Sequence, residues 1–243
     1  MTQKAKRPTK AMVLAAGLGR RMRPITATTP KPLVSVAGKA LIDHGLDRLA
    51  AAGIETAVVN VHYLADLVEY HVCKRHQPQI VISDEREALL DTGGGILKAL
   101  PHFEDAPFIL LNSDSFWIEG VRPNLDILSG SWDDTRMDIL LMLASTVHSV
   151  GYSGRGDFML AADGRLTRRA ERAVAPFVYA GAAVLHPRIF GAVESGAFSL
   201  NRLFDEAIEK DRLFGVRMEG VWFHVGTPAA VKSADIAVLD SAA

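Results

Sequence analysis

The stretch AMVLAAGLGRRMRP, residues 11–24, joins an apolar run to a glycine-rich turn and a cluster of arginines. Residues 11–15 predict a buried first strand, and the turn after it carries Gly17 and Gly19. Glycine lets a backbone approach an anion closely, and the free N–H groups of such a turn point at the anion. The stretch therefore predicts a phosphate-binding loop at the start of an α/β fold.

Two common phosphate motifs do not fit this loop. A P-loop requires Gly-Lys-Ser/Thr where residues 20–22 are Arg-Arg-Met, and a dinucleotide fingerprint requires a third glycine at position 22. Positive charge strengthens the case instead, because Arg20, Arg21 and Arg23 precede Lys31, which lies between two prolines that stiffen the chain. A rigid cationic loop suits a triphosphate. The alternative, a solvated basic loop, is disfavoured by the glycines and by the proline-framed lysine.

Bulk properties narrow the class of protein. The chain has 243 residues, a net charge of -1 and one cysteine, so we expect no nucleic-acid partner and a cytoplasmic location without disulfides. The longest strongly apolar run, residues 139–144, is too short to span a bilayer, and no membrane partner is expected. Residues 1–10 are polar and basic and predict a flexible tail.

Strand-like and helical patterns alternate through the first half, which is typical of βαβ units and a mostly parallel sheet. We predict strands at 11–15, 56–61, 79–82 and 108–111, and helices at 41–52, 64–74 and 95–100. The second half is mixed, with strands at 138–144, 158–160, 166–168, 177–185, 213–218 and 221–225 and helices at 200–209 and 229–239. Residues 213–218 and 221–225 look like a strand pair. Residues 11–243 are interpreted as one domain, with a nucleotide-binding half (11–115) and a sugar-binding half (116–243).

The loop and its continuation match a known pattern. Residues 14–24, followed by Thr26 and by PKPL at 30–33, closely resemble the signature of sugar-1-phosphate nucleotidyltransferases. Further segments resemble the same family up to about residue 230: DTGGGI (91–96), GRGDF (154–158), VLHP (184–187) and VGT (225–227). The resemblance implies a GT-A-like fold, a Rossmann-like, mostly parallel mixed sheet flanked by helices. It also implies transfer of a nucleotidyl group to a sugar 1-phosphate with release of pyrophosphate.

The resemblance also implies residue roles. Nucleotide binding falls to Leu14, Ala15, Ala16, Gly17, Gly19, Arg21, Lys31, Glu85 and Gly93; catalysis to Arg21, Lys31 and Asp114; and sugar binding to Asn112, Asp157 and Gly181. The attacking sugar phosphate is already an anion near neutral pH, since its second pKa is about 6. No general base is therefore required, and positioning and positive charge supply most of the catalysis.

The metal ligands depart from the family pattern. Asp114 is the Mg²⁺ ligand that the resemblance implies, but His224 stands where the family normally has a second aspartate. Histidine is a poor ligand for Mg²⁺ and a better one for Mn²⁺, Co²⁺ or Zn²⁺. His224 could bind a softer metal, bind a metal-held water or a phosphate, or leave Mg²⁺ to Asp114 and the substrates. Our hypothesis is retained activity with an altered metal preference.

Substrate choice is less determined. A carboxylate at Glu85 could accept the N3 proton of uracil or two protons of guanine, or it could be a surface group. By resemblance alone, UTP and N-acetylmuramate 1-phosphate are favoured. The alternatives are GTP with a mannose- or heptose-type 1-phosphate, or a catalytically weak nucleotide-sugar sensor. A monomer or a small homo-oligomer is expected.

Overall fold

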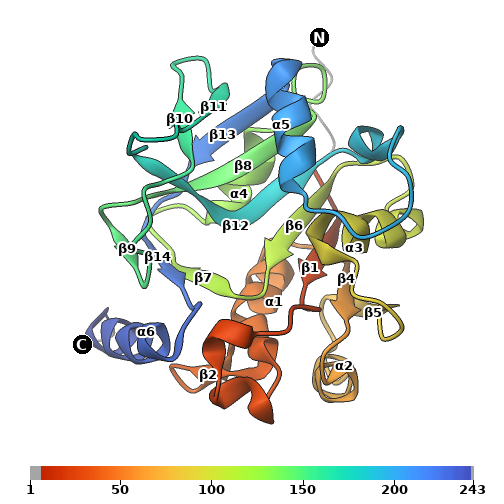
Figure 1. Ribbon diagram of the computed structural model, residues 1–243, viewed down its shortest axis with the longest axis vertical. Helices are drawn as coiled ribbons and strands as arrows, with labels where there is room; N and C mark the ends of the chain where they lie inside the picture. Colours follow the sequence, from red (N-terminus) through yellow and green to blue (C-terminus); the bar gives the residue numbers. More distant parts are fainter. Residues whose placement is uncertain (1–6, 242–243) are drawn as a thin grey trace.

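The predicted first strand is an inner strand of a nine-stranded sheet in the computed structural model, which describes residues 7–241 (Figure 1). β1 (Lys10–Leu14) pairs in parallel with β4 (Thr56–Val61) and β6 (Phe108–Asn112), and β5 (Gln79–Asp84) extends the sheet beyond β4. The chain runs outward from β1 to β4 and β5, then returns to β6 on the other side of β1. This reversal makes a topological switch point, where open α/β sheets bind their ligands.

The second half of the chain continues the same sheet. β12 (Phe177–Leu185) lies antiparallel between β6 and β8 (Ile139–Ser145), and β13 (Leu213–Arg217) is parallel to β8. The strands predicted at 158–160 and 166–168 form a hairpin, β10 (Phe158–Leu160) and β11 (Leu166–Arg168), which joins the start of β12. The prediction of a mixed sheet flanked by helices is confirmed.

Different helices cover the two faces of the sheet. Along β1, Val13 packs into one core and Met12 into the other, as strand alternation requires. The first core is completed by α1 (Leu41–Ala51), α2 (Ala65–Val72) and α4 (Asn124–Gly130). The second is completed by α3 (Asp91–Ala99) and α5 (Asn201–Glu209).

A smaller sheet lies beside the first one. It has the order β7 (Ser115–Ile118), β14 (Val221–His224), β9 (Ser149–Val150), and Phe116 stacks on Phe223 at 4.7 Å between ring centroids. A third core forms here and includes the fully buried Met22. Because Met22 directly follows Arg20 and Arg21, its burial anchors the arginine turn.

The remaining elements are short or terminal. The C-terminal helix α6 (Pro228–Ser241) lies near the ribbon β2 (Ser35–Val36) and β3 (Lys39–Ala40) (Figure 1). Short 3₁₀ helices occupy Arg20–Met22, Ile25–Ala27, Lys31–Leu33, Leu100–His102 and Pro187–Phe190. Among residues 7–241, no helix is both long enough and apolar enough to cross a membrane.

Two predictions about secondary structure are wrong. Residues 213–218 and 221–225 do not pair with each other, because β13 joins the large sheet and β14 the small one. Both strands are apolar, and periodicity does not reveal a partner. The third helix begins at Asp91 rather than Gly95, since three successive glycines extend it. Glycine has poor helix propensity, but here it permits close packing.

The predicted tail is only partly described. Residues 1–6 lie outside the described residues. Lys10 already belongs to β1, and the carbonyl of Thr9 accepts a hydrogen bond from the Glu55 N–H at 2.8 Å. The tail prediction is therefore wrong for Thr9 and Lys10, because this stretch is hydrogen-bonded to the chain that leads into β4.

Candidate active site

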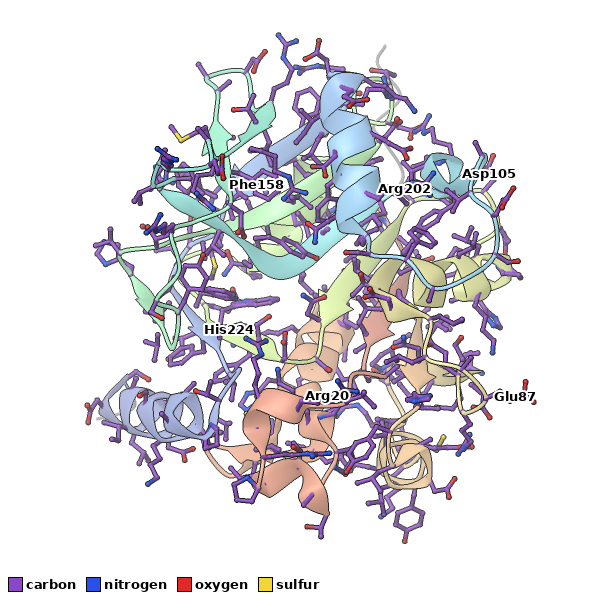
Figure 2. All side chains as sticks on the ribbon, in the orientation of Figure 1. Arg20, Glu87, Asp105, Phe158, Arg202 and His224 are labelled. Carbon is purple, nitrogen blue, oxygen red and sulfur yellow. The ribbon has the colours of Figure 1, made fainter. Side chains whose placement is uncertain are left out.

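A cavity of about 470 Å³ opens at the carboxyl ends of β1 and β6. Its walls come from the glycine-arginine turn, the proline-framed lysine, the end of β4, the segment entering α3 and the residues after β6. The lining residues are Leu14, Ala15, Ala16, Gly17, Gly19, Arg20, Arg21, Met22, Lys31, Pro32, Asn60, Leu89, Asp91, Thr92, Asn112, Ser113, Asp114 and Gly226. Figure 2 labels Arg20 on the turn and His224 at the end of β14.

The turn after β1 presents backbone donors to this cavity. Within the described residues, the N–H groups of Ala16, Gly17 and Gly19 have no protein partner. The N–H of Ala15 is already donated to Asn60 Oδ1 at 2.7 Å. The Ala15 N–H is therefore engaged within the protein, although Ala15 itself lines the cavity, and its contact with the nucleotide stays a prediction. The neighbouring groups retain the anion-binding capacity of such a turn.

Position 19 of the turn requires a glycine. Its φ is +60°, and a Cβ there would lie 2.9 Å from Thr26 Cγ2 and 3.2 Å from Lys31 Cβ. The hydroxyl of Thr26 donates to the Gly19 carbonyl at 2.8 Å. Gly19 therefore sets the packing of the turn against Lys31.

We predict that Gly19→Ala lowers the free energy of unfolding by about 1–2 kcal/mol, the cost of a left-handed non-glycine residue. It should also reduce kcat/KM about 10- to 100-fold, because Lys31 is displaced. Urea titration and steady-state kinetics measure the two effects. Gly17→Ala is the control for stability, since a Cβ there meets nothing within 4 Å. An unchanged kcat/KM in Gly19→Ala would contradict the prediction.

Lys31 and Asp114 form an ion pair at the centre of the cavity. Lys31 Nζ lies 2.8 Å from Asp114 Oδ2, and the two side chains are 12% and 29% exposed. Burial alone would raise the pKa of Asp114, but the charge and hydrogen bond of Lys31, helped by His224 and Arg21, hold that pKa below its ordinary value. The carboxylate is therefore ionised and available as a hard oxygen ligand.

His224 lies beside Asp114 because of strand register. Ser115 pairs with His224 across β7 and β14, and the Val225 N–H donates to the Asp114 carbonyl at 3.0 Å. Burial lowers the pKa of His224; the charge of Asp114 opposes this shift, while Lys31 and Arg21 reinforce it. The imidazole is thus neutral near pH 7 and has a nitrogen lone pair to offer.

Residues predicted for the sugar divide into two groups. Asn112 lines the cavity, and Gly181 lies against it, where a Cβ would be 3.2 Å from Asn112 Cβ and 2.3 Å from Ser115 Oγ. Asp157 does not line this cavity. Its Oδ2 accepts a hydrogen bond from the Tyr179 N–H at 3.0 Å, so the carboxylate holds β12 in place.

The structure does not support base contacts from Glu85 and Gly93. Glu85 is 1% exposed, and its Oε1 accepts a hydrogen bond from Asn60 Nδ2 at 2.7 Å. Gly93 is packed against Phe198, whose ring would lie 2.2 Å from an added Cβ, and its N–H donates to the Phe198 carbonyl at 2.9 Å. Neither residue lines the cavity. Both instead form hydrogen bonds that fix the start of α3.

Asn60 was not predicted as a site residue. It is 2% exposed and lines the cavity from the end of β4. A signal was available, since an amide stands in the otherwise apolar run TAVVNV (56–61) near the carboxyl end of a parallel strand. Ser113 ties β6 to β1 by donating its hydroxyl to the Leu14 carbonyl at 2.7 Å.

Few protein side chains in the cavity could act as ligands for a metal ion. Among residues 7–241, no three His, Cys, Asp or Glu side chains are grouped so that they could hold a metal ion. Asp114 and His224 supply at most two protein ligands. This fits a cation that takes its remaining ligands from substrate phosphates and water, as Mg²⁺ usually does.

A cationic, glycine-rich turn at the switch point of an open sheet, facing an ionised aspartate, defines a nucleotide-binding transferase. The family model described as nucleotidyl transferase matches residues 10–127. An N-acetylmuramate alpha-1-phosphate uridylyltransferase of Caulobacter vibrioides is 50% identical, over 94% of this chain and 96% of that protein. One from Neisseria meningitidis is 32% identical, over 93% and 96%.

Solved structures agree with this fold. An apo UDP-glucose pyrophosphorylase superimposes with a TM-score of 0.75 at 16% identity, covering 97% of this chain and all of that one. The chain belongs to the sugar-1-phosphate nucleotidyltransferase family. It is an enzyme that transfers a nucleotidyl group to a sugar 1-phosphate.

Proposed function

We propose that this enzyme transfers the uridylyl group of UTP to N-acetylmuramate 1-phosphate, yielding a UDP-sugar and pyrophosphate. The observation that carries the proposal is the Lys31–Asp114 pair, held at 2.8 Å beside a turn with free N–H groups. The choice of base and sugar rests on the two uridylyltransferases to which the chain is 50% and 32% identical.

The chemistry needs charge more than proton transfer. A phosphate oxygen of the sugar 1-phosphate attacks the α-phosphorus of UTP, the bond from that phosphorus to the bridging oxygen breaks, and pyrophosphate leaves. Lys31 and Arg21 stabilise the charge that builds on the phosphates. The N–H groups of Ala16, Gly17 and Gly19 hold the triphosphate. The sugar lies beside Asn112 and Gly181, on the side of the cavity that faces the second half of the chain.

Asp114 and His224 would hold a divalent cation together with substrate oxygens. When bound, such a cation neutralises phosphate charge during transfer. Mg²⁺ is the first candidate. Mn²⁺ or Co²⁺ suits the imidazole better.

We predict that His224→Asp shifts the metal preference toward Mg²⁺, because a second carboxylate replaces a nitrogen ligand. The ratio of kcat/KM with Mg²⁺ to that with Mn²⁺ or Co²⁺ should rise about 10-fold in the variant. Pyrophosphate release measures this ratio in both proteins. Identical metal profiles would show that His224 does not touch the metal. His148→Asp is the control, since that histidine is exposed and, unlike His224, is not among the groups whose charge acts on Asp114.

A matrix of triphosphates against sugar 1-phosphates tests the proposed function. UTP, GTP, CTP and dTTP are combined with the 1-phosphates of N-acetylmuramate, N-acetylglucosamine, mannose and a heptose, and pyrophosphate is measured. The highest kcat/KM should belong to UTP with N-acetylmuramate 1-phosphate. Preference for GTP with mannose or heptose 1-phosphate would overturn the substrate assignment. Nucleotide binding without pyrophosphate release would indicate a sensor.

Location and assembly complete the proposal. We infer a cytoplasmic enzyme, in keeping with the single free cysteine, Cys73. A monomer or a small homo-oligomer remains the expected assembly.

A further inference from the structure

A buried chain of hydrogen bonds joins the triphosphate turn to the segment that enters α3. The Ala15 N–H donates to Asn60 Oδ1 at 2.7 Å, and Asn60 Nδ2 donates to Glu85 Oε1 at 2.7 Å. The other carboxylate oxygen, Glu85 Oε2, accepts from the Leu90 N–H at 3.1 Å. Asn60 and Glu85 are 2% and 1% exposed, so water does not compete for these bonds.

The direction of every bond in this chain is determined. A backbone N–H can only donate, so the Asn60 oxygen must face Ala15 and its NH₂ group must face Glu85. Both oxygens of Glu85 act as acceptors, one from Asn60 and one from Leu90. No Lys, Arg or His side chain forms an ion pair with it in the part of the chain that the structure describes. A buried carboxylate that lacks a cation is costly, which favours a specific role for it.

The hydrogen-bonded side chains of Asn60 and Glu85 are also tightly confined. His62 Nδ1 donates to the Glu85 carbonyl at 2.7 Å and holds its backbone. A Cβ at Gly95 would lie 2.6 Å from Glu85 Oε1 and 2.8 Å from Asn60 Nδ2. Gly95 is therefore a packing requirement of the pair, and α3 cannot move without disturbing it.

These bonds link two walls of one cavity. Ala15 begins the phosphate turn, and the residues after Glu85 include Leu89, Asp91 and Thr92 in the cavity lining. The three cations that line the cavity, Arg20, Arg21 and Lys31, all lie on the phosphate side. The α3 side lacks a lining cation, which suits an uncharged base better than a phosphate.

We propose that Asn60 and Glu85 are a positioning pair that sets the spacing between the phosphate turn and the base-facing segment. The pair thereby controls the affinity for the triphosphate and not that for the sugar phosphate. This inference rests on the proposed function, because it takes the cavity as the triphosphate site. Glu85 contributes to nucleotide binding without touching the base.

Each of two single substitutions, Glu85→Gln and Asn60→Asp, should disrupt this series of hydrogen bonds. In Glu85→Gln, the new NH₂ group must face either Asn60 Nδ2 or the Leu90 N–H, and donor meets donor in both orientations. In Asn60→Asp, a second carboxylate oxygen faces Glu85 Oε1 inside the protein. We expect each variant to raise the KM for UTP at least 10-fold and to leave the KM for the sugar phosphate within twofold.

The double variant Asn60→Asp/Glu85→Gln should restore the chain with its middle bond reversed. Asp at 60 accepts from the Ala15 N–H and from the new amide NH₂, while the amide oxygen at 85 accepts from the Leu90 N–H. Charge and volume are conserved. The KM for UTP should return to within about threefold of wild type, which is a strong non-additivity for residues in contact.

The experiment measures kcat, both KM values and the thermal midpoint for all four proteins at saturating Mg²⁺. Glu87→Gln is the matched control, because Figure 2 shows Glu87 at the outer edge of the molecule, and its side chain is exposed. If a single variant does not fold, Gly95→Ala provides the same test by pushing the pair apart, again with a raised KM for UTP. Single variants that lose thermal stability but keep the wild-type KM for UTP would overturn the proposal.

Failure of the proposed function would give a different result from failure of the positioning pair. It would appear in the wild-type enzyme as absent pyrophosphate release with UTP. The KM comparison would then use the triphosphate identified by the substrate matrix. A wild-type enzyme that is active while Glu85→Gln keeps an unchanged KM for that triphosphate contradicts the positioning pair alone.

Discussion

Lys31→Met is expected to lower kcat/KM about 10²- to 10³-fold, the effect of removing one preorganised group that stabilises transition-state charge. The Lys31 side chain is only 12% exposed, and the residue lines the cavity. Water cannot readily replace it, and the change also leaves Asp114 without its nearest cation. Most of the loss should fall on kcat, because charge builds on the phosphates during transfer.

Pyrophosphate release at saturating substrates measures this loss. Lys74→Met is the control, since Lys74 is an exposed residue that only covers the ring of Tyr70. Lys31→Arg separates charge from geometry and should recover only part of the activity, because a guanidinium differs in shape from an ammonium. A kcat in Lys31→Met within threefold of wild type would refute the role of Lys31.

Asp114→Asn is expected to lower kcat on the order of 10²- to 10³-fold and to abolish tight binding of Mn²⁺. The substitution keeps the size of the side chain but removes the only carboxylate in the possible ligand pair Asp114 and His224. A neutral amide oxygen is a weaker ligand for a hard cation than a carboxylate. The half-buried Lys31 then loses its partner, and the charge balance of the cavity changes.

Binding of Mn²⁺, followed by electron paramagnetic resonance with UTP present, gives a readout that does not depend on turnover. Asp66→Asn is a suitable control, because that side chain is 91% exposed and lies on α2. If Asp114→Asn bound Mn²⁺ as well as wild type, Asp114 would not be a ligand of the cation.

Local patterns predicted most of the elements. Apolar runs identified the strands of the large sheet, including β10 and β11, which pair with each other. The helix predicted at 41–52 ends at Ala51, and Gly53, with φ +76°, follows just beyond it. The short elements β7 and α4 were missed, since four and seven residues provide too little periodicity.

The candidate site was predicted in part. The cationic turn, Lys31, Asn112 and Asp114 do line one cavity, because parallel strands bring their carboxyl ends to the same edge. Five predicted residues lie outside that lining: Glu85, Gly93, Asp157, Gly181 and His224. The first three hold other segments in place. A carboxylate in a loop looks the same in sequence whether it binds a ligand or a neighbouring amide.

The sequence by itself determined the phosphate turn, because Gly17, Gly19 and the proline-framed Lys31 act through local backbone geometry and fixed charge. Only the tertiary structure decided which groups of that turn remain free. Asn60, reaching across from β4, occupies the Ala15 N–H and is locked in orientation by Glu85. The reason is physical: backbone conformation is set by neighbours along the chain, whereas hydrogen-bond partners in a buried site come from residues 45 and 25 positions apart.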